Sequence, residues 1–238
     1  MRRRFFVDEI HSGKAEILGE DARHLTRVLR VEVGQQYEIS DNKNVYLAEI
    51  EMARKEHVVF RATEKLAAPH PTVQVTLCAS LIKFDHFEWM VEKATELGVT
   101  TFVPMVATRS EKGLDKAARG RVDRWRRIAL ETCQQCRRAK LPVVEEATAF
   151  SKVMTCEFPI RYALDEEGGE PLLQALPAAK SVTDHVALLT GPEGGWTDGE
   201  RDTFVAAGWK RVSLGPLILR AETAALAALS IIQAGWIE

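Results

Sequence analysis

Two glycine-bearing loops near the C-terminus carry the residue types that best fit ligand binding. The first, GPEGGW at Gly191 to Trp196, follows the apolar run VALLT, and the second, LGPLILRAETA at Leu214 to Ala224, follows RVS. Glycine lets the backbone approach a ligand closely. In an open α/β sheet, ligands bind beyond the carboxyl ends of the strands, so the two loops could wall one site. Either loop taken alone is equally consistent with an ordinary tight turn.

The spacing of these glycines excludes two common phosphate-binding motifs. No GxGxxG occurs, and the glycines lie late in the chain rather than in a first strand-to-helix turn. The P-loop pattern GxxxxGK[ST] is absent as well. A purine-bearing cofactor without a pyrophosphate fits better, held by backbone N–H and C=O groups and by an apolar wall. That wall would consist of Leu189, Leu214, Ile218 and Leu219.

The formal net charge of −2 conceals a strong asymmetry along the chain. Arg109 to Lys140 contains eleven basic and four acidic residues, whereas Leu141 to Phe204 contains four basic and twelve acidic residues. Near the N-terminus lie Arg2, Arg3 and Arg4, and then Arg23, Arg27 and Arg30, whose spacing puts three guanidiniums on one helical face. One such face could simply be solvated and paired with nearby acids. Three basic clusters together favour a nucleic acid as partner.

Cysteine usage and hydropathy indicate a folded cytoplasmic protein. Four scattered cysteines do not make a disulfide framework, and no apolar run of about 18 residues predicts a membrane span. Cys133 and Cys136 form a CxxC within a predicted helix, without a second CxxC or paired histidines to complete a metal site. We therefore expect helix packing rather than metal or redox chemistry at this motif, no bound metal, and no membrane partner.

The elements that must position the glycine loops follow from the hydrophobic pattern. Residues 1–68 predict a small β-barrel with one helix, and the prolines at 69 and 71 mark a linker. Residues 72–238 alternate strands and helices, which predicts an α/β domain with a mostly parallel sheet. The expected strands are 4–7, 36–40, 45–52, 57–63, 73–79, 101–106 and 160–164, with two more near 186 and 212, and the expected helices are 22–29, 84–97, 119–138, 171–176, 198–207 and 221–233.

Several blocks of the chain resemble the SPOUT class of RNA methyltransferases, most closely the family that methylates N3 of a uridine in bacterial 16S ribosomal RNA. The similarity spans nearly the full chain. Its blocks are Arg4 to Val7 with His24, Leu25 and Val28 to Arg30; Lys83, Lys93 to Gly98, Pro104, Arg109 and Ser110; Gln135, Cys136, Arg138 and Pro142; and GPEGG with LILRAETA. The chain departs from the family pattern at Leu217, where arginine is common, and at Gln134, where glutamate is frequent.

The resemblance implies a PUA-like RNA-binding β-barrel in residues 1–68 and a SPOUT domain with a trefoil knot in residues 72–238. It further implies an S-adenosyl-L-methionine cofactor, a homodimer, and 16S rRNA within the 30S subunit as partner. The expected cofactor-binding residues are Leu189, Thr190, Gly191, Pro192, Glu193, Gly194, Gly195, Leu214, Gly215, Ile218, Leu219 and Thr223. The expected RNA-binding residues are Arg2, Arg3, Arg4, Arg23, Arg27, Arg30, Arg109, Arg124 and Arg138.

Methyl transfer to a uracil nitrogen requires removal of the N3 proton or stabilisation of the charge that spreads onto O2 and O4. Arg220, Glu222 and Thr223 are the expected catalytic residues, with Arg220 stabilising the oxyanion and Glu222 orienting the base or accepting a proton. Glu222 could equally be a structural residue, because an acidic side chain in the first turn of the final helix interacts favourably with the helix dipole. Two alternatives stay open: a SPOUT enzyme that acts on another RNA, and a ribosome-assembly RNA-binding protein without catalysis.

Overall fold

The computed structural model describes residues 3–68 and 70–237, and the chain forms two compact units. One unit comprises Met1–His70 and Leu130–Leu141, and the other comprises Pro71–Ala129 and Pro142–Glu238. The boundaries expected from the sequence, 1–68 and 72–238, did not anticipate that Leu130–Leu141 would group with the N-terminal residues. The segment holds the second half of the helix Val122–Cys136 and the turn after it, and its grouping depends on contacts distant in sequence.

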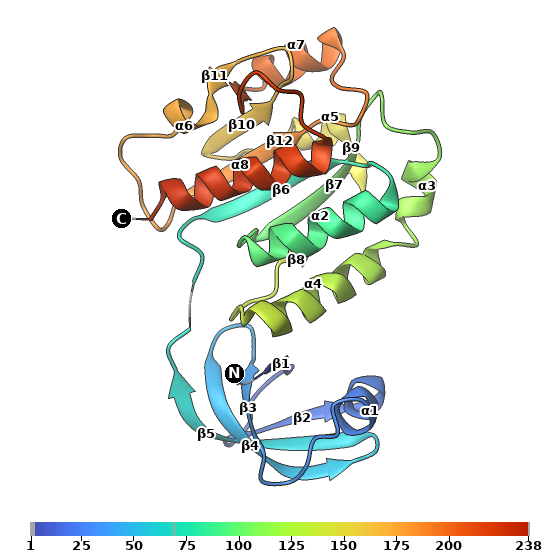
Figure 1. The fold of residues 1–238 in the computed structure, drawn as a ribbon, viewed down its shortest axis with the longest axis vertical. Helices are drawn as coiled ribbons and strands as arrows, with labels where there is room; N and C mark the ends of the chain where they lie inside the picture. The colour runs from blue at the N-terminus through green and yellow to red at the C-terminus, as the bar shows by residue number, and fades with distance from the viewer. Residues whose placement is uncertain (1–2, 69, 238) are drawn as a thin grey trace. The chain divides into compact units, whose positions relative to one another are not determined.

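The N-terminal unit contains a curled five-stranded sheet with the strand order β1-β3-β4-β5-β2 (Figure 1). Its strands are β1 (Arg4–Phe6), β2 (Lys14–Leu18), β3 (Gln36–Ser40), β4 (Val45–Arg54) and β5 (His57–Leu66), and its helix is α1 (Gly19–Arg27). β1 and β3 pair in parallel, and the other pairs are antiparallel. Within the described residues β1 and β2 do not pair with each other, so the expected barrel is an open, curled sheet. The sequence reading missed β2, whose side chains alternate between exposed and buried.

A buried cluster of charges lies within the N-terminal unit. The Arg4 side chain is only 2% exposed, and its Nη2 lies 2.7 Å from Oε2 of Glu38. Arg137, within the Leu130–Leu141 segment, also pairs with Glu38. Arg4 in turn donates a hydrogen bond to the backbone carbonyl oxygen of Arg137. The expectation that Arg4 binds RNA phosphate is therefore wrong for this structure, because its guanidinium is buried and already paired.

The C-terminal unit is built on an eight-stranded sheet in which every pair is parallel. The order is β11-β13-β10-β12-β6-β7-β8, with β9 pairing with β7. The strands are β6 (Gln74–Ser80), β7 (Thr101–Val106), β8 (Val143–Val144), β9 (Thr148–Ala149), β10 (Ile160–Leu164), β11 (Glu170–Pro171), β12 (His185–Thr190) and β13 (Lys210–Ser213). Because the strands are parallel, the loops that leave β10, β12 and β13 emerge at one edge of the sheet.

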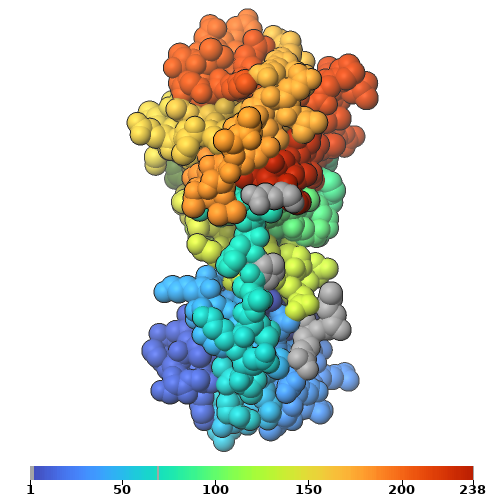
Figure 2. All heavy atoms as spheres, turned by 90° about the vertical axis from the view of Figure 1, so that its left-hand side faces the viewer, coloured from blue at the N-terminus to red at the C-terminus, as the bar shows by residue number. Residues whose placement is uncertain are grey.

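Helices cover both faces of this sheet, as expected for an α/β domain. The helices are α2 (Phe84–Glu96), α3 (Leu114–Ala118), α4 (Val122–Cys136), α5 (Phe150–Val153), α6 (Leu172–Ala175), α7 (Asp198–Ala206) and α8 (Ala221–Gly235). One core joins α2, the first half of α4, α6 and α8 to one face, and a second core joins α5 and α7 to the other. The segments coloured yellow to red form a continuous surface in the view of Figure 2.

The single long helix expected over 119–138 is shorter in the structure, and a short helix that was not expected, α3, precedes it. α3 and α4 are separated by a turn at Arg119 to Arg121, and α4 ends at Cys136. Gly120, a poor helix former, lies in that turn. The difference matters for the basic residues of this region, because those on α3 and those on α4 occupy different environments.

We predict that Arg4→Met destabilises the sheet of the N-terminal unit by about 3 kcal/mol, because it leaves the Glu38 carboxylate buried and only partly compensated. Hydrogen–deuterium exchange of peptides from β3 and β4 should then be roughly a hundredfold faster. Arg3→Met, at the exposed neighbouring position, is the control and should change stability by less than about 0.5 kcal/mol. Equal exchange rates in the two variants would contradict the structural role of Arg4.

Candidate functional site

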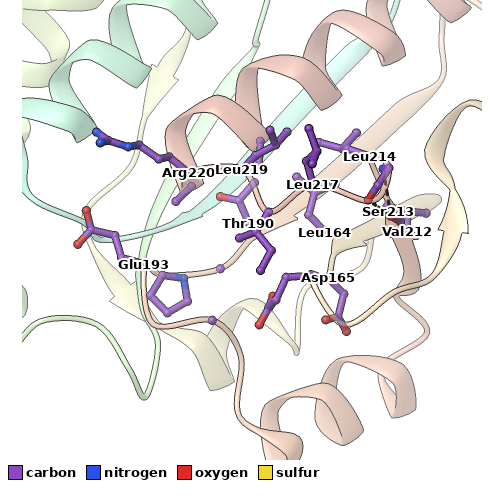
Figure 3. A pocket seen from close by; sticks show the side chains of 18 of the residues that line it. Leu164, Asp165, Thr190, Glu193, Val212, Ser213, Leu214, Leu217, Leu219 and Arg220 are labelled. Atoms are coloured by element: carbon purple, nitrogen blue, oxygen red, sulfur yellow. Dashed lines mark hydrogen bonds between the residues drawn. The ribbon is translucent and has the colours of Figure 1, made fainter.

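A cavity of ≈ 570 Å³ lies at the carboxyl edge of the parallel sheet in the C-terminal unit (Figure 3). Three segments line it: Leu164–Glu166 after β10, Thr190–Gly195 after β12, and Val212–Arg220 leading into Ala221 and Ala224 of α8. The two glycine loops predicted to wall one site therefore do share one cavity. The volume lies within the range of small-molecule sites, roughly 300–1,000 Å³.

The loop after β12 is shaped by close packing against its glycines. A Cβ atom on Gly191 would lie 3.0 Å from the indole ring of Trp196, and the Trp196 Nε1 donates to the carbonyl oxygen of Leu164 at 2.8 Å. Arg109, from the loop after β7, donates from Nη1 to the carbonyl oxygens of Gly194 and Trp196 at 3.0 and 3.1 Å. These contacts fix the backbone of the loop while leaving its other side on the cavity.

The loop after β10 was not identified from the sequence, yet it supplies the third wall. The Asp165 side chain is completely buried and accepts from Arg201 Nε at 3.2 Å and from Arg211 Nε at 2.8 Å. Arg201 also donates to Glu166 at 2.9 Å. A buried carboxylate between two arginines is costly to disrupt, so the network holds the β10 loop beside β13 and α7.

A capping box orients the end of the β12 loop. Thr197, the N-cap of α7, accepts from the Glu200 backbone N–H, and the Glu200 carboxylate accepts from the Thr197 N–H at 2.9 Å. The same carboxylate accepts from the Thr108 N–H at 2.8 Å. Burial alone would raise the pKa of Glu200, but these backbone hydrogen bonds outweigh it and lower the pKa below its usual value. Glu200 thus ties the β12 loop to the loop after β7.

Of the three expected catalytic residues, only Arg220 lines the cavity. It is the N-cap of α8, and its exposed guanidinium makes no hydrogen bond or ion pair with the described part of the chain. In Figure 3 its side chain projects on the same side of the view as Glu193. Glu222 instead turns toward α2: its side chain is 9% exposed, and Oε1 lies 3.0 Å from Nδ1 of His86. Thr223 is exposed on the first turn of α8.

Ten of the twelve expected cofactor-binding residues line the cavity: Thr190, Gly191, Pro192, Glu193, Gly194, Gly195, Leu214, Gly215, Ile218 and Leu219. Leu189 and Thr223 do not. The Leu189 side chain is fully buried in the core beneath α5 and α7, so it does not form part of the cavity wall. Leu217, at the position that departs from the family pattern, lines the cavity and is 78% exposed.

The expected RNA-binding arginines occupy several different environments. Arg2 lies outside the described residues, and Arg3, Arg27 and Arg30 are exposed. Arg23 pairs with Glu20 and Glu56, and Arg124 pairs with Glu88 at 2.7 Å. Arg138 is half-buried, and burial lowers the pKa of its guanidinium. Some of the arginines expected to bind RNA, Arg23 and Arg124 among them, therefore form ion pairs within the protein.

The CxxC motif has the features of packing rather than of chemistry. Cys133 is buried in α4, and burial raises the pKa of its thiol to about 12, so the reactive thiolate is disfavoured at neutral pH. Among residues 3–68 and 70–237 no cluster of histidine, cysteine and carboxylate side chains is arranged to hold a metal ion. The described helices include none with the length and apolarity needed to cross a bilayer.

Comparison with known proteins identifies the family. A family model described as an RNA methyltransferase domain matches residues 68–233, and one described as an RNA methyltransferase PUA domain matches residues 17–62. The ribosomal RNA small subunit methyltransferase E of Synechocystis sp. is 35% identical over 89% of this chain and 70% of its own length, and that of Bacillus subtilis is 31% identical over 91% and 88%. The chain belongs to the ribosomal RNA small subunit methyltransferase E family.

Solved structures support the fold of this methyltransferase family member over nearly its whole length. The ribosomal RNA small subunit methyltransferase E of Neisseria gonorrhoeae, bound to S-adenosyl methionine, is 25% identical with a TM-score of 0.88 over 98% of both chains. A Legionella pneumophila protein in complex with the same cofactor is 27% identical with a TM-score of 0.89 over 98% of both chains. The expected α/β fold with a PUA domain is confirmed, and the trefoil knot stays a prediction.

We predict that Gly195→Ala destabilises the C-terminal unit by about 1–2 kcal/mol. Gly195 has a φ of +68°, and a Cβ atom there would overlap Oε1 of Glu166, which Arg201 holds in place. The control is Gly199→Ala at an open position within α7, which should be neutral or slightly stabilising. Thermal unfolding monitored by tryptophan fluorescence measures both, and equal midpoints would contradict the proposed packing of the β10 and β12 loops.

Proposed function

We propose that this protein transfers the methyl group of S-adenosyl-L-methionine to N3 of a uracil in 16S rRNA of the bacterial small ribosomal subunit. The observation that carries the proposal is the single cavity formed by both glycine loops, in a chain of the ribosomal RNA small subunit methyltransferase E family. The two solved structures bound to the same cofactor support the choice of methyl donor.

The cavity suits this cofactor in size and in chemistry. Leu164, Val212, Leu214 and Leu219 provide an apolar wall for an adenine ring. The backbone groups of the two glycine loops provide donors and acceptors, and the Glu193 carboxylate provides negative charge suited to a cationic ligand. When bound, the cofactor supplies an activated methyl group on a sulfonium, so the protein needs mainly to align the acceptor.

Arg220 is the residue placed best to assist the acceptor base. Loss of the N3 proton spreads negative charge onto O2 and O4 of the uracil ring, and a guanidinium beside the cavity stabilises that charge as it develops. The Arg220 guanidinium is exposed and has no partner within the described residues, so it need not give up an ion pair to do this. Its position at the N-cap of a fifteen-residue helix fixes the backbone from which it extends.

Glu222 and Thr223 are proposed to act less directly than Arg220. The Glu222 carboxylate lies outside the cavity lining, at the first turn of α8, where it also meets the helix dipole. Oε1 is held by His86, whereas Oε2 is buried without a hydrogen-bond partner in the described chain. We propose that Glu222 orients the base or accepts its proton through water, and that Thr223 assists at the exposed side of the same turn.

Dimerisation, the partner and the cellular location are also proposals. We propose a homodimer that acts on 16S rRNA within the 30S subunit in the cytoplasm, with the exposed arginines Arg3, Arg27 and Arg30 of the PUA domain contacting phosphates. The small side chains of the alanine-rich stretch Ala224 to Ala228 on α8 could allow a partner to pack closely, but they give this dimer little support. Ala225 and Ala228 are fully buried in the core of their own chain, and Ala224 lines the cavity.

The test is methylation of 30S subunits lacking the modification, followed by mapping of the modified nucleoside. We expect 3-methyluridine at one position of 16S rRNA. Arg220→Met should lower kcat by about a hundredfold or more while the Kd of S-adenosyl-L-methionine stays within twofold, and Lys210→Met is the exposed control. Methylation of transfer RNA or large-subunit RNA instead would favour another target, and absence of cofactor binding in calorimetry would favour a non-catalytic RNA-binding protein.

Glu222→Gln separates the two interpretations of that carboxylate. If Glu222 takes part in proton removal, the variant folds, binds the cofactor and methylates more slowly. A variant that folds and methylates at the wild-type rate would exclude the catalytic role and leave Glu222 as a structural residue of α8.

A further inference from the structure

The segment after β7 carries cations that no described carboxylate neutralises. From Arg109 to Arg121 the sequence holds five basic and two acidic residues, a net charge of +3. Within this segment the side chains of Lys112, Lys116 and Arg119 are exposed. None of the three forms an ion pair or side-chain hydrogen bond with the part of the chain that the structure describes.

The arginines on and just before the neighbouring helix α4, by contrast, form ion pairs. Arg124 Nε lies 2.7 Å from Oε1 of Glu88, and the same oxygen receives Arg121 at 3.1 Å. Arg126 pairs with Asp123 at 3.2 Å and with Glu146 at 3.3 Å. A paired cation must release its carboxylate before it can bind a phosphate, so these arginines contribute less to polyanion binding than unpaired ones.

The unpaired cations lie at the edge of the sheet that carries the cavity. β7 ends at Val106, and the segment that follows leaves the same carboxyl edge as the cavity loops. Figure 1 shows α3 at the same end of the sheet as the first turns of α2 and α8. Arg109, at the start of the segment, is bonded to the carbonyl oxygens of Gly194 and Trp196 in the β12 loop. The segment is thus attached directly to a wall of the cavity.

We propose that Lys112, Lys116 and Arg119 form the phosphate-contacting surface of the C-terminal unit and bind the RNA backbone that flanks the base at the cavity. This inference rests on the proposed function, because it requires an RNA base to reach the cavity. Of the two arginines of this unit that the sequence indicated, Arg109 hydrogen-bonds to the β12 loop and Arg124 pairs with Glu88, so the proposal assigns phosphate binding to cations on and beside α3 instead. Exposed lysines bind phosphate as flexible point charges and release condensed counterions when they do so.

The test compares two double variants that remove the same charge. K112Q/K116Q alters the proposed surface. K180Q/K210Q alters two exposed lysines at the opposite edge of the sheet, Lys180 in the loop before β12 and Lys210 at the start of β13, where it pairs with Glu170. Binding to 30S subunits is measured by fluorescence anisotropy from 0.05 to 0.2 M KCl at fixed Mg²⁺. The slope of log K against log[KCl] should fall in magnitude by about 1.4 for K112Q/K116Q, from about 0.7 per contact, with roughly tenfold weaker binding at 0.1 M.

The control variant K180Q/K210Q should keep the wild-type slope and affinity, and the Kd of S-adenosyl-L-methionine should be unchanged in both. Adding Arg119→Gln to K112Q/K116Q should reduce the slope by about a further 0.7. Equal slopes for the two double variants, in an enzyme whose wild type methylates 30S subunits, would overturn this surface and leave the proposed function standing. A wild type that neither binds nor methylates 30S subunits would overturn both.

Discussion

The cavity depends on a buried carboxylate that two arginines hold at the carboxyl end of β10. Asp165 accepts hydrogen bonds from Arg201 of α7 and from Arg211 of β13. This one side chain therefore links the neighbouring helix and strand to the loop that follows β10. Without this network, Leu164–Glu166 would carry unpaired buried charge. With it, the loops after β10, β12 and β13 meet at one edge and enclose a common space.

For function, the consequence is that the backbone of the β12 loop is held in place while charged side chains at the cavity stay exposed. Trp196, Arg109 and Glu200, which do not line the cavity, fix the β12 loop and its neighbours through hydrogen bonds. The cavity side keeps glycine backbone, an apolar wall and, besides Glu166, which pairs with Arg201, two exposed charged groups, Glu193 and Arg220. A preorganised backbone of this kind suits a reaction in which the donor is already activated and alignment supplies most of the rate.

Local patterns predicted most of the fold and both glycine loops, because strand hydropathy, helix propensity and glycine spacing are properties of neighbouring residues. What they missed depends on residues distant in sequence. Asp165 finds its arginines 36 and 46 residues away, and Arg4 finds Glu38 34 residues away, so one was overlooked and the other was taken for a surface charge. Glu222 was expected at the cavity, but the packing of α8 against α2 turns it toward His86. The direction of a helical side chain is set by that packing, which the motif does not encode.

The most direct test of the cavity as a cofactor site is hydrogen–deuterium exchange of the full chain with and without saturating S-adenosyl-L-methionine. The account predicts slower exchange in peptides covering Leu164–Glu166, Thr190–Gly195 and Val212–Ala224, with little change in β1 to β5 of the N-terminal unit. Unchanged exchange in all three segments, or protection confined to another part of the molecule, would contradict it.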